Sequence, residues 1–109
     1  MQSDTFDRVC TAIASGRIHV SEHAYDEAVE DDLSVLDVID RTPDGEVIED
    51  YPNDPRGSSC LVLLNLGDEQ PVHAVWAFDD DAGRAILITV YHPDPARWSD
   101  DLRQRRPKT

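Results

Sequence analysis

The sequence lacks the features that would place the chain in a membrane or outside the cell. It has no apolar run near the roughly 20 residues that a membrane-spanning helix needs. Its first residues are polar, unlike those of a secretory signal. The two cysteines, Cys10 and Cys60, lie far apart in apolar patterns, which indicates reduced thiols in the core. We therefore expect a cytoplasmic protein that makes no contact with a membrane and folds without disulfides.

Common motifs for nucleotides and metals are also missing. The sequence has no glycine-rich phosphate loop and no Gly-x-Ser-x-Gly nucleophile motif. His19 and His23 have the i, i+4 spacing of some zinc sites, but a helix capped by Ser21 would leave His19 outside it. We therefore expect no metal ion and no cofactor.

Lysine is scarce, and the acidic charge is unevenly distributed. The 109 residues include 23 Asp or Glu and 10 Lys or Arg, for a formal net charge of −13. Residues 97–109 have a net charge of +3, which leaves −16 for residues 1–96. An excess of Asp with a single Lys is typical of proteins that stay hydrated in concentrated salt, so we expect a halophilic source. The alternative is ordinary solubility through self-repulsion.

The hydrophobic patterns predict one α+β domain, residues 1–109. Residues 1–42 have apolar residues at helical spacing, whereas residues 46–92 have extended and alternating patterns. We predict two to three N-terminal helices packed on a four-stranded antiparallel sheet. Residues 17–20 are expected to form an extended link, and residues 97–109 a basic tail. The predicted strands are residues 47–51, 59–66, 72–78 and 84–92.

Local signals predict how the helices begin and which sides they bury. Asp4 is the predicted N-cap of the first helix, and Ser21 that of the second. The third helix is expected to start at Leu33-Ser34. Its expected inward-facing residues are Val35, Leu36, Val38 and Ile39.

Several segments occur in the order found in one known family. They are His19–Ala24, Leu33-Ser34, Val47–Tyr51, Pro71–Val75, and Ile88–Asp94 with Trp98. Over roughly residues 17–106, this set resembles the domain of unknown function family 4258. Its members resemble the small RelE-, MqsR- and BrnT-like toxins, in which helices precede an antiparallel sheet. Many of those toxins are metal-independent ribonucleases that are paired with an antitoxin.

The resemblance implies a RelE-like, or BECR-like, fold and metal-independent cleavage of RNA. It also implies an antitoxin protein, of the zinc-finger or helix-turn-helix type, as a partner. One position departs from the family pattern, because Glu27 stands where the family usually has an arginine, four residues after His23. If that arginine binds phosphate, this chain has lost a phosphate ligand. The alternative is a non-catalytic protein-interaction module on the same fold.

Two histidines are the candidate acid and base. His23 lies just inside a predicted helix N-terminus, where anions bind, and an imidazole can both accept and donate a proton near neutral pH. The alternative is a hydrogen bond that docks the helix on the sheet. His73 lies on the strand face opposite Val72 and Trp76, so we expect it on the open face of the sheet. Its alternative role is a half-exposed strand residue.

The register of the last hairpin decides what surrounds His73. If Asp79 pairs with Arg84, His73 shares a face with Arg84, Ile88 and His92. A shift of one residue places His73 beside Thr89 and Tyr91 instead. The sequence leaves both registers open.

Further candidates are an arginine, a tyrosine and the basic tail. Arg84 can clamp a phosphate or pair with Asp79 or Asp80 across the hairpin. Tyr91 can contact a base or donate a proton, or simply pack on the sheet. The tail can follow an RNA backbone, fold over the acidic body or extend into solvent. The candidate RNA-binding residues of the tail are Arg97, Arg103, Arg105 and Arg106.

Overall fold

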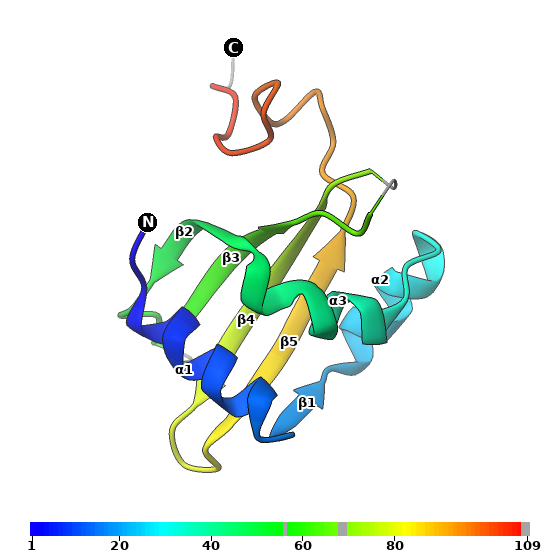
Figure 1. Cartoon of the computed structure of the whole chain (residues 1–109). Coiled ribbons are helices and arrows are strands. Elements are labelled where there is room, and N and C mark those ends of the chain that lie inside the picture. Colours follow the sequence, from blue (N-terminus) through cyan, green and yellow to red (C-terminus); the bar gives the residue numbers. More distant parts are fainter. Residues whose placement is uncertain (56, 68–69, 108–109) are drawn as a thin grey trace.

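The computed structural model of the chain describes residues 1–55, 57–67 and 70–107. Lys108, the single lysine of the predicted basic tail, lies outside the described residues. The described residues form three α-helices and five strands, the α+β class that the sequence predicts (Figure 1). None of these helices is long and apolar enough to cross a membrane. The helices are α1 (Asp4–Ala14), α2 (Glu22–Glu30) and α3 (Val35–Arg41). The strands are β1 (Ile18–Val20), β2 (Glu46–Tyr51), β3 (Ser59–Leu64), β4 (Val72–Asp79) and β5 (Arg84–Tyr91).

The strands form one mixed sheet in the order β1-β5-β4-β3-β2. Strands β2 to β5 pair antiparallel in chain order. Strand β1 pairs in parallel with β5, with Ile18 opposite Ala85 and Val20 opposite Leu87. The expectations of a simple link at residues 17–20 and of a wholly antiparallel, four-stranded sheet are therefore wrong. Three residues are too few to show an alternating pattern, and this segment becomes a strand because the edge of β5 offers unpaired backbone groups.

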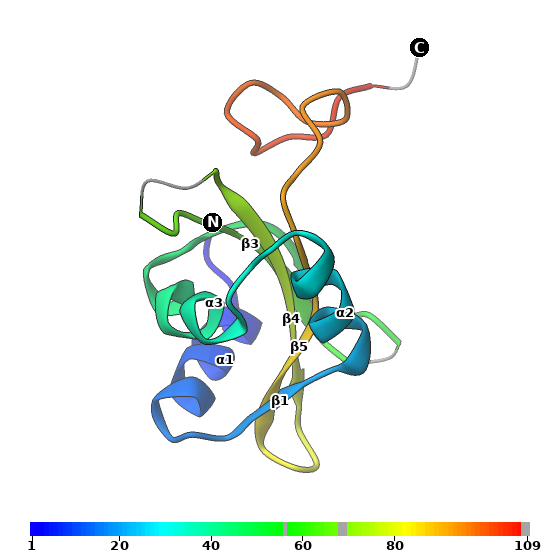
Figure 2. The ribbon, with the colours of Figure 1, turned by 90° about the vertical axis from the view of Figure 1, so that its right-hand side faces the viewer.

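Helices α1 and α3 lie on one face of the sheet and α2 lies at its β5 edge (Figure 2), and the main core contains buried residues of all three helices and of the sheet. Trp76 on β4 is fully buried, and its indole N–H donates to the Thr42 hydroxyl at 3.1 Å. The Thr42 hydroxyl in turn donates to the carbonyl oxygen of Val38 at 2.7 Å. Val72 and Ala74 are buried in the same layer, which confirms the predicted inward face of this strand.

Two local predictions on the helices are wrong. Ser3, not Asp4, caps α1, because the Ser3 hydroxyl accepts a hydrogen bond from the Phe6 N–H at 3.1 Å. Leu36 on α3 has 77% of its surface exposed, whereas Val38 is fully buried. A helix of seven residues packs only one narrow stripe against the sheet, and Leu36 lies outside that stripe. Ser21 caps α2 as predicted.

The C-terminal segment, residues 93–107, is folded and does not extend freely into solvent. It leaves the end of β5 and turns back on itself, with Trp98 and Arg105 forming an isolated antiparallel bridge (Figure 1). Trp98 is 4% exposed and packs in a second, smaller core with Ile48, Leu61 and Leu63. We call residues 94–106 the tail strap. The part of the sheet that was expected to be open is therefore covered here.

Candidate functional site

The β4–β5 hairpin contains a β-bulge that changes its register along the strand. Asp79 lies opposite Arg84, as in the first predicted register. The pairing then shifts beside Val75, which lies opposite Thr89 and leaves Ile88 as the extra residue. His73 consequently lies opposite Tyr91, on the face that the second register predicted, although neither uniform register applies to the whole hairpin.

His73 is fully buried beneath the tail strap. Its Nε2 lies 2.9 Å from the carbonyl oxygen of Leu102. Because a carbonyl only accepts, we assign the ring proton to Nε2, which leaves Nδ1 as an acceptor 3.4 Å from the Tyr91 hydroxyl. The Trp98 ring lies edge-on to the imidazole, 4.4 Å between centroids. Burial lowers the pKa of His73, so the ring is neutral at pH 7.

A carboxylate, a guanidinium and a phenol lie next to this pair. Arg105 of the tail strap donates to both carboxylate oxygens of Glu49 on β2, at 2.9 and 3.0 Å. Tyr51 also donates to Glu49. Burial by itself raises the pKa of Glu49, but the hydrogen bonds from Arg105 and Tyr51 outweigh it and hold this pKa below its ordinary value. The Arg105 guanidinium lies 4.8 Å from the centroid of the Trp98 ring.

Glu27 joins α2 to the end of β5. It pairs with the Nε2 of His23 one turn earlier in the helix, and it accepts a hydrogen bond from the Thr89 hydroxyl. The side chain of His23 is 69% exposed, and its Nδ1 is the ring nitrogen that does not pair with Glu27. Ser21 fixes this end of the helix on the sheet, because its hydroxyl donates to the carbonyl oxygen of Ile88 at 2.9 Å.

Three of the four predicted catalytic residues lie around the end of β5: His73 contacts Tyr91, and His23 is linked to Thr89 through Glu27. Tyr91 and Thr89 are alternate residues on one strand face, roughly 7 Å apart. Burial raises the pKa of Tyr91, and the nearby charge of Glu27 adds to this rise. We call the following group the β5-end cluster: His23, Glu27, His73, Thr89, Tyr91 and, from the tail strap, Arg105.

Arg84 lies outside this cluster. It pairs with Asp79 across the hairpin at 3.8 Å, the alternative that the sequence offered. Asp79 is six residues along β4 from His73, a separation of roughly 20 Å. Arg84 therefore does not share a site with His73 in this conformation.

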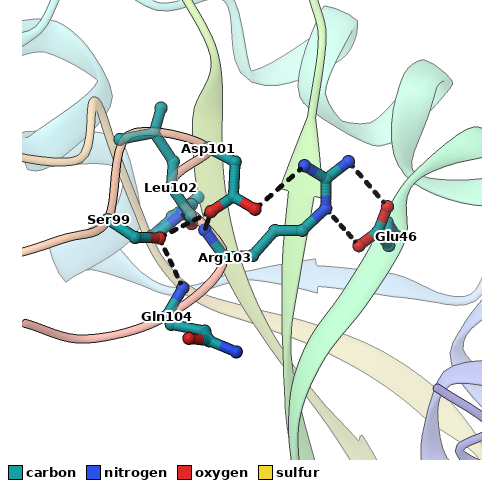
Figure 3. A network of polar contacts seen from close by, with 7 residues as sticks. Glu46, Ser99, Asp101, Leu102, Arg103 and Gln104 are labelled. Carbon is teal, nitrogen blue, oxygen red and sulfur yellow. Dashed lines mark hydrogen bonds and ion pairs between the residues drawn. The ribbon is translucent and has the colours of Figure 1, made fainter.

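The four arginines of the tail strap divide into two pairs. Arg97 and Arg106 pair within the strap, with Asp94 at 3.9 Å and Asp100 at 2.9 Å. Arg103 and Arg105 pair with the acidic body, and Arg103 also pairs with Asp101 of the strap at 3.7 Å. Figure 3 shows Arg103 donating to both carboxylate oxygens of Glu46, at 2.6 and 3.0 Å. For these two side chains, the predicted alternative of a tail folded over the body is confirmed.

Sequence reasoning did not identify Glu49, Tyr51 and Trp98 as members of the site. Glu49 and Tyr51 are two residues apart in a predicted strand, so their shared face was a detectable signal. The sequence does not show that this face of β2 lies on the same side of the sheet as the site residues of β5, from which it is separated by β3 and β4. Within the described residues, no group of three or more His, Cys, Asp or Glu side chains can hold a metal ion.

The chain was compared with protein families, curated proteins and solved structures. The model of the family described as Domain of unknown function (DUF4258) matches residues 20–92. The chain belongs to this family. No curated protein and no solved structure matches it significantly.

The DUF4258 match includes most of the β5-end cluster but not the tail strap. His23, Glu27, His73 and Tyr91 all lie within residues 20–92. Trp98 and Arg105 lie beyond the matched region, as does the rest of the strap. Five of the six cluster residues therefore lie within the matched region, whereas Arg105 and the segment that covers His73 lie beyond it.

Proposed function

We propose that this DUF4258 domain is related to the RelE-like toxins and cleaves RNA without a metal ion, at the β5-end cluster. The observation that carries the proposal is the position of Glu27, which links the exposed His23 to Thr89, two residues before Tyr91 at the end of β5. Tyr91 in turn faces His73 on β4. This position also gives Glu27 a role. A carboxylate bound to one imidazole nitrogen orients the ring and stabilises its protonated form.

The reaction is a transesterification within the RNA strand. The Nδ1 of His23, the ring nitrogen not bound to Glu27, takes the proton of a ribose 2′-OH, and the 2′-oxygen attacks the adjacent phosphorus atom. As the bond to the 5′-oxygen breaks, the Tyr91 hydroxyl gives its proton to that oxygen. The products are a 2′,3′-cyclic phosphate and a 5′-hydroxyl end. His73 acts through Tyr91, because its Nδ1 faces the Tyr91 hydroxyl at 3.4 Å and orients it.

Charge is the main obstacle to this function. The net charge of −16 on residues 1–96 repels RNA, so attraction has to come from the arginines of the tail strap. Arg105 is near enough to Tyr91 to lower its pKa, against the effect of burial. A phosphate beside Tyr91 would therefore also lie near a guanidinium, the group that best matches its geometry.

The test is cleavage of a fluorescent RNA by the purified protein in EDTA, over a range of salt concentrations. We expect a cyclic-phosphate product and a loss of roughly 100-fold or more in His23→Ala, since an acid–base group contributes about that much. Arg84→Ala is the matched control and should keep wild-type activity. Absence of cleavage by the wild-type protein, or equal rates in His23→Ala, would refute the proposal.

A second candidate is a non-catalytic module that binds a basic, amphipathic segment of an antitoxin protein. Tyr25 and Val29, one turn apart on α2, are 52% and 79% exposed, and Leu36 on α3 is 77% exposed. Residues 21–40 contain eight acidic residues and no Lys or Arg, so the charge around these apolar side chains suits a basic partner. A Lys- and Leu-rich amphipathic peptide should bind wild-type protein more tightly than Val29→Asp, whereas a scrambled peptide should not distinguish them.

A further inference from the structure

The tail strap is attached to the body by two acidic side chains of one strand. Glu46 binds Arg103, and Glu49 binds Arg105, each through both carboxylate oxygens. Both pairs are partly open to solvent, since the arginine side chains are 46% and 63% exposed. Exposed ion pairs contribute little to stability and weaken in salt, so these contacts can be exchanged for others.

A carboxylate bound in this way occupies the place that a phosphate would take. The planar guanidinium donates two parallel hydrogen bonds to carboxylates and phosphates alike. While Glu46 and Glu49 hold the two arginines, the positive charge of the strap is neutralised and cannot attract RNA. The same docked conformation buries His73 completely.

The strap also carries a surface for a nucleobase. The Arg105 guanidinium lies over the Trp98 ring, and this ring also packs on His73 in a T-shaped arrangement. Indole rings stack on bases in proteins that bind single-stranded nucleic acids. Release of the strap would therefore free two guanidinium groups and an aromatic ring together.

We propose that the tail strap is an autoinhibitory cover, in which Glu46 and Glu49 take the place of two phosphates of a single-stranded RNA. Binding of RNA transfers Arg103 and Arg105 from these carboxylates to the phosphates and uncovers the pair of Tyr91 and His73. This inference rests on the proposed function for the identity of the site. The cover itself is tested by binding alone.

The experiment compares binding of a 2′-O-methyl RNA oligonucleotide, which cannot form the cyclic product, by fluorescence anisotropy at low salt. The Glu46→Gln/Glu49→Gln variant should bind about tenfold more tightly than a control with the same net charge, because two exposed ion pairs no longer compete. The control is Asp26→Asn/Glu30→Gln, two exposed acids of α2. Equal affinity of the two variants would overturn the inference.

Hydrogen exchange supplies a second measurement on the wild-type protein. Saturation with the oligonucleotide should increase exchange of backbone amides in residues 97–106, and Arg103→Gln/Arg105→Gln should bind the oligonucleotide more weakly than wild type. Continued protection of these amides in the complex would overturn the inference. If the strap is released but no variant cleaves ordinary RNA, the proposed RNA cleavage is refuted, whereas the inference that the strap is an autoinhibitory cover still holds.

Discussion

The Nε2 of His73 donates to the carbonyl oxygen of Leu102 at 2.9 Å, across 29 residues of sequence. Leu102 has a φ of +62°, a left-handed conformation that leucine rarely adopts. This conformation is compensated by the hydrogen bond and by packing of the Leu102 side chain in the smaller core. The tail strap is thus bent at the residue whose carbonyl oxygen meets the buried imidazole.

Removal of the Trp98 side chain should release the strap. Trp98→Ala removes a side chain that is 4% exposed, and we expect a loss of about 3 kcal/mol in the free energy of unfolding. Urea denaturation measures this loss. Arg97→Ala, at the neighbouring position, is the control and should change the value by less than about 0.5 kcal/mol, because its side chain is 85% exposed. Similar values for both variants would show that the strap does not pack as described.

Stability should fall as the pH decreases from about 7 to 5, in part because of His73. Burial lowers the pKa of His73, while Glu49 and the Leu102 carbonyl partly offset this and Arg105 adds to it. The folded state therefore binds a proton less readily than the unfolded chain, whose histidine has a pKa near 6.5. Above that pKa, the contribution of neutral His73 to the free energy of unfolding is fully present. This contribution is lost as the pH falls toward the lower pKa that His73 has in the folded state.

The His73→Gln variant isolates this effect. Its free energy of unfolding should depend less on pH between about 7 and 5 than that of the wild type, because the group that titrates there has been removed. Denaturation curves at several pH values measure the two slopes. His19→Gln, at an exposed position, is the control. A slope in His73→Gln as steep as in the wild type would show that another group is responsible.

Tyr91→Phe should separate catalysis from folding. The change removes only the hydroxyl that faces the Nδ1 of His73, and a single hydrogen bond contributes about 1 kcal/mol to stability. If Tyr91 protonates the leaving oxygen, the cleavage rate should fall by roughly 100-fold. Tyr25→Phe, on the exposed side of α2, should keep the wild-type rate. An unchanged rate in Tyr91→Phe would remove Tyr91 from the mechanism.

Glu27→Gln should lower the rate of cleavage. The amide oxygen can still accept from Thr89, but the carboxylate that pairs with the Nε2 of His23 is lost. We expect the maximal rate to fall about tenfold, because the imidazole that takes the proton is less firmly oriented. Cleavage rates of the purified variants measure this loss. Glu22→Gln, an exposed change in the same helix, is expected to keep the wild-type rate, and a loss of equal size there would argue against a specific role for Glu27.

Local signals were sufficient for much of the fold. Helical spacing and the cap at Ser21 placed α2, and alternation placed Trp76 in the core and His73 on the other face. These features depend on side chains close together in sequence, so the pattern itself contains the information. The error at Leu36 arose because helical spacing does not show how wide a stripe the sheet will cover.

The site depended on contacts between distant parts of the chain. The bulge at Ile88 joined His73 to Tyr91, and no local residue pattern indicated it. Glu27 looked like the loss of a phosphate ligand, yet in the fold it connects His23 to Thr89.

The sequence by itself determined the α+β class, the inward face of β4 and the membership in DUF4258, because each follows from the order and spacing of residues along the chain. Only the tertiary structure decided that β1 joins the sheet and that the basic tail lies on Glu46 and Glu49. Strand edges and opposite charges find their partners through space, across 57 residues of sequence in the case of Arg103 and Glu46. For that reason the pattern of β4 did not predict that His73 is buried, because the residues that cover it, Trp98 and Leu102, belong to the tail strap.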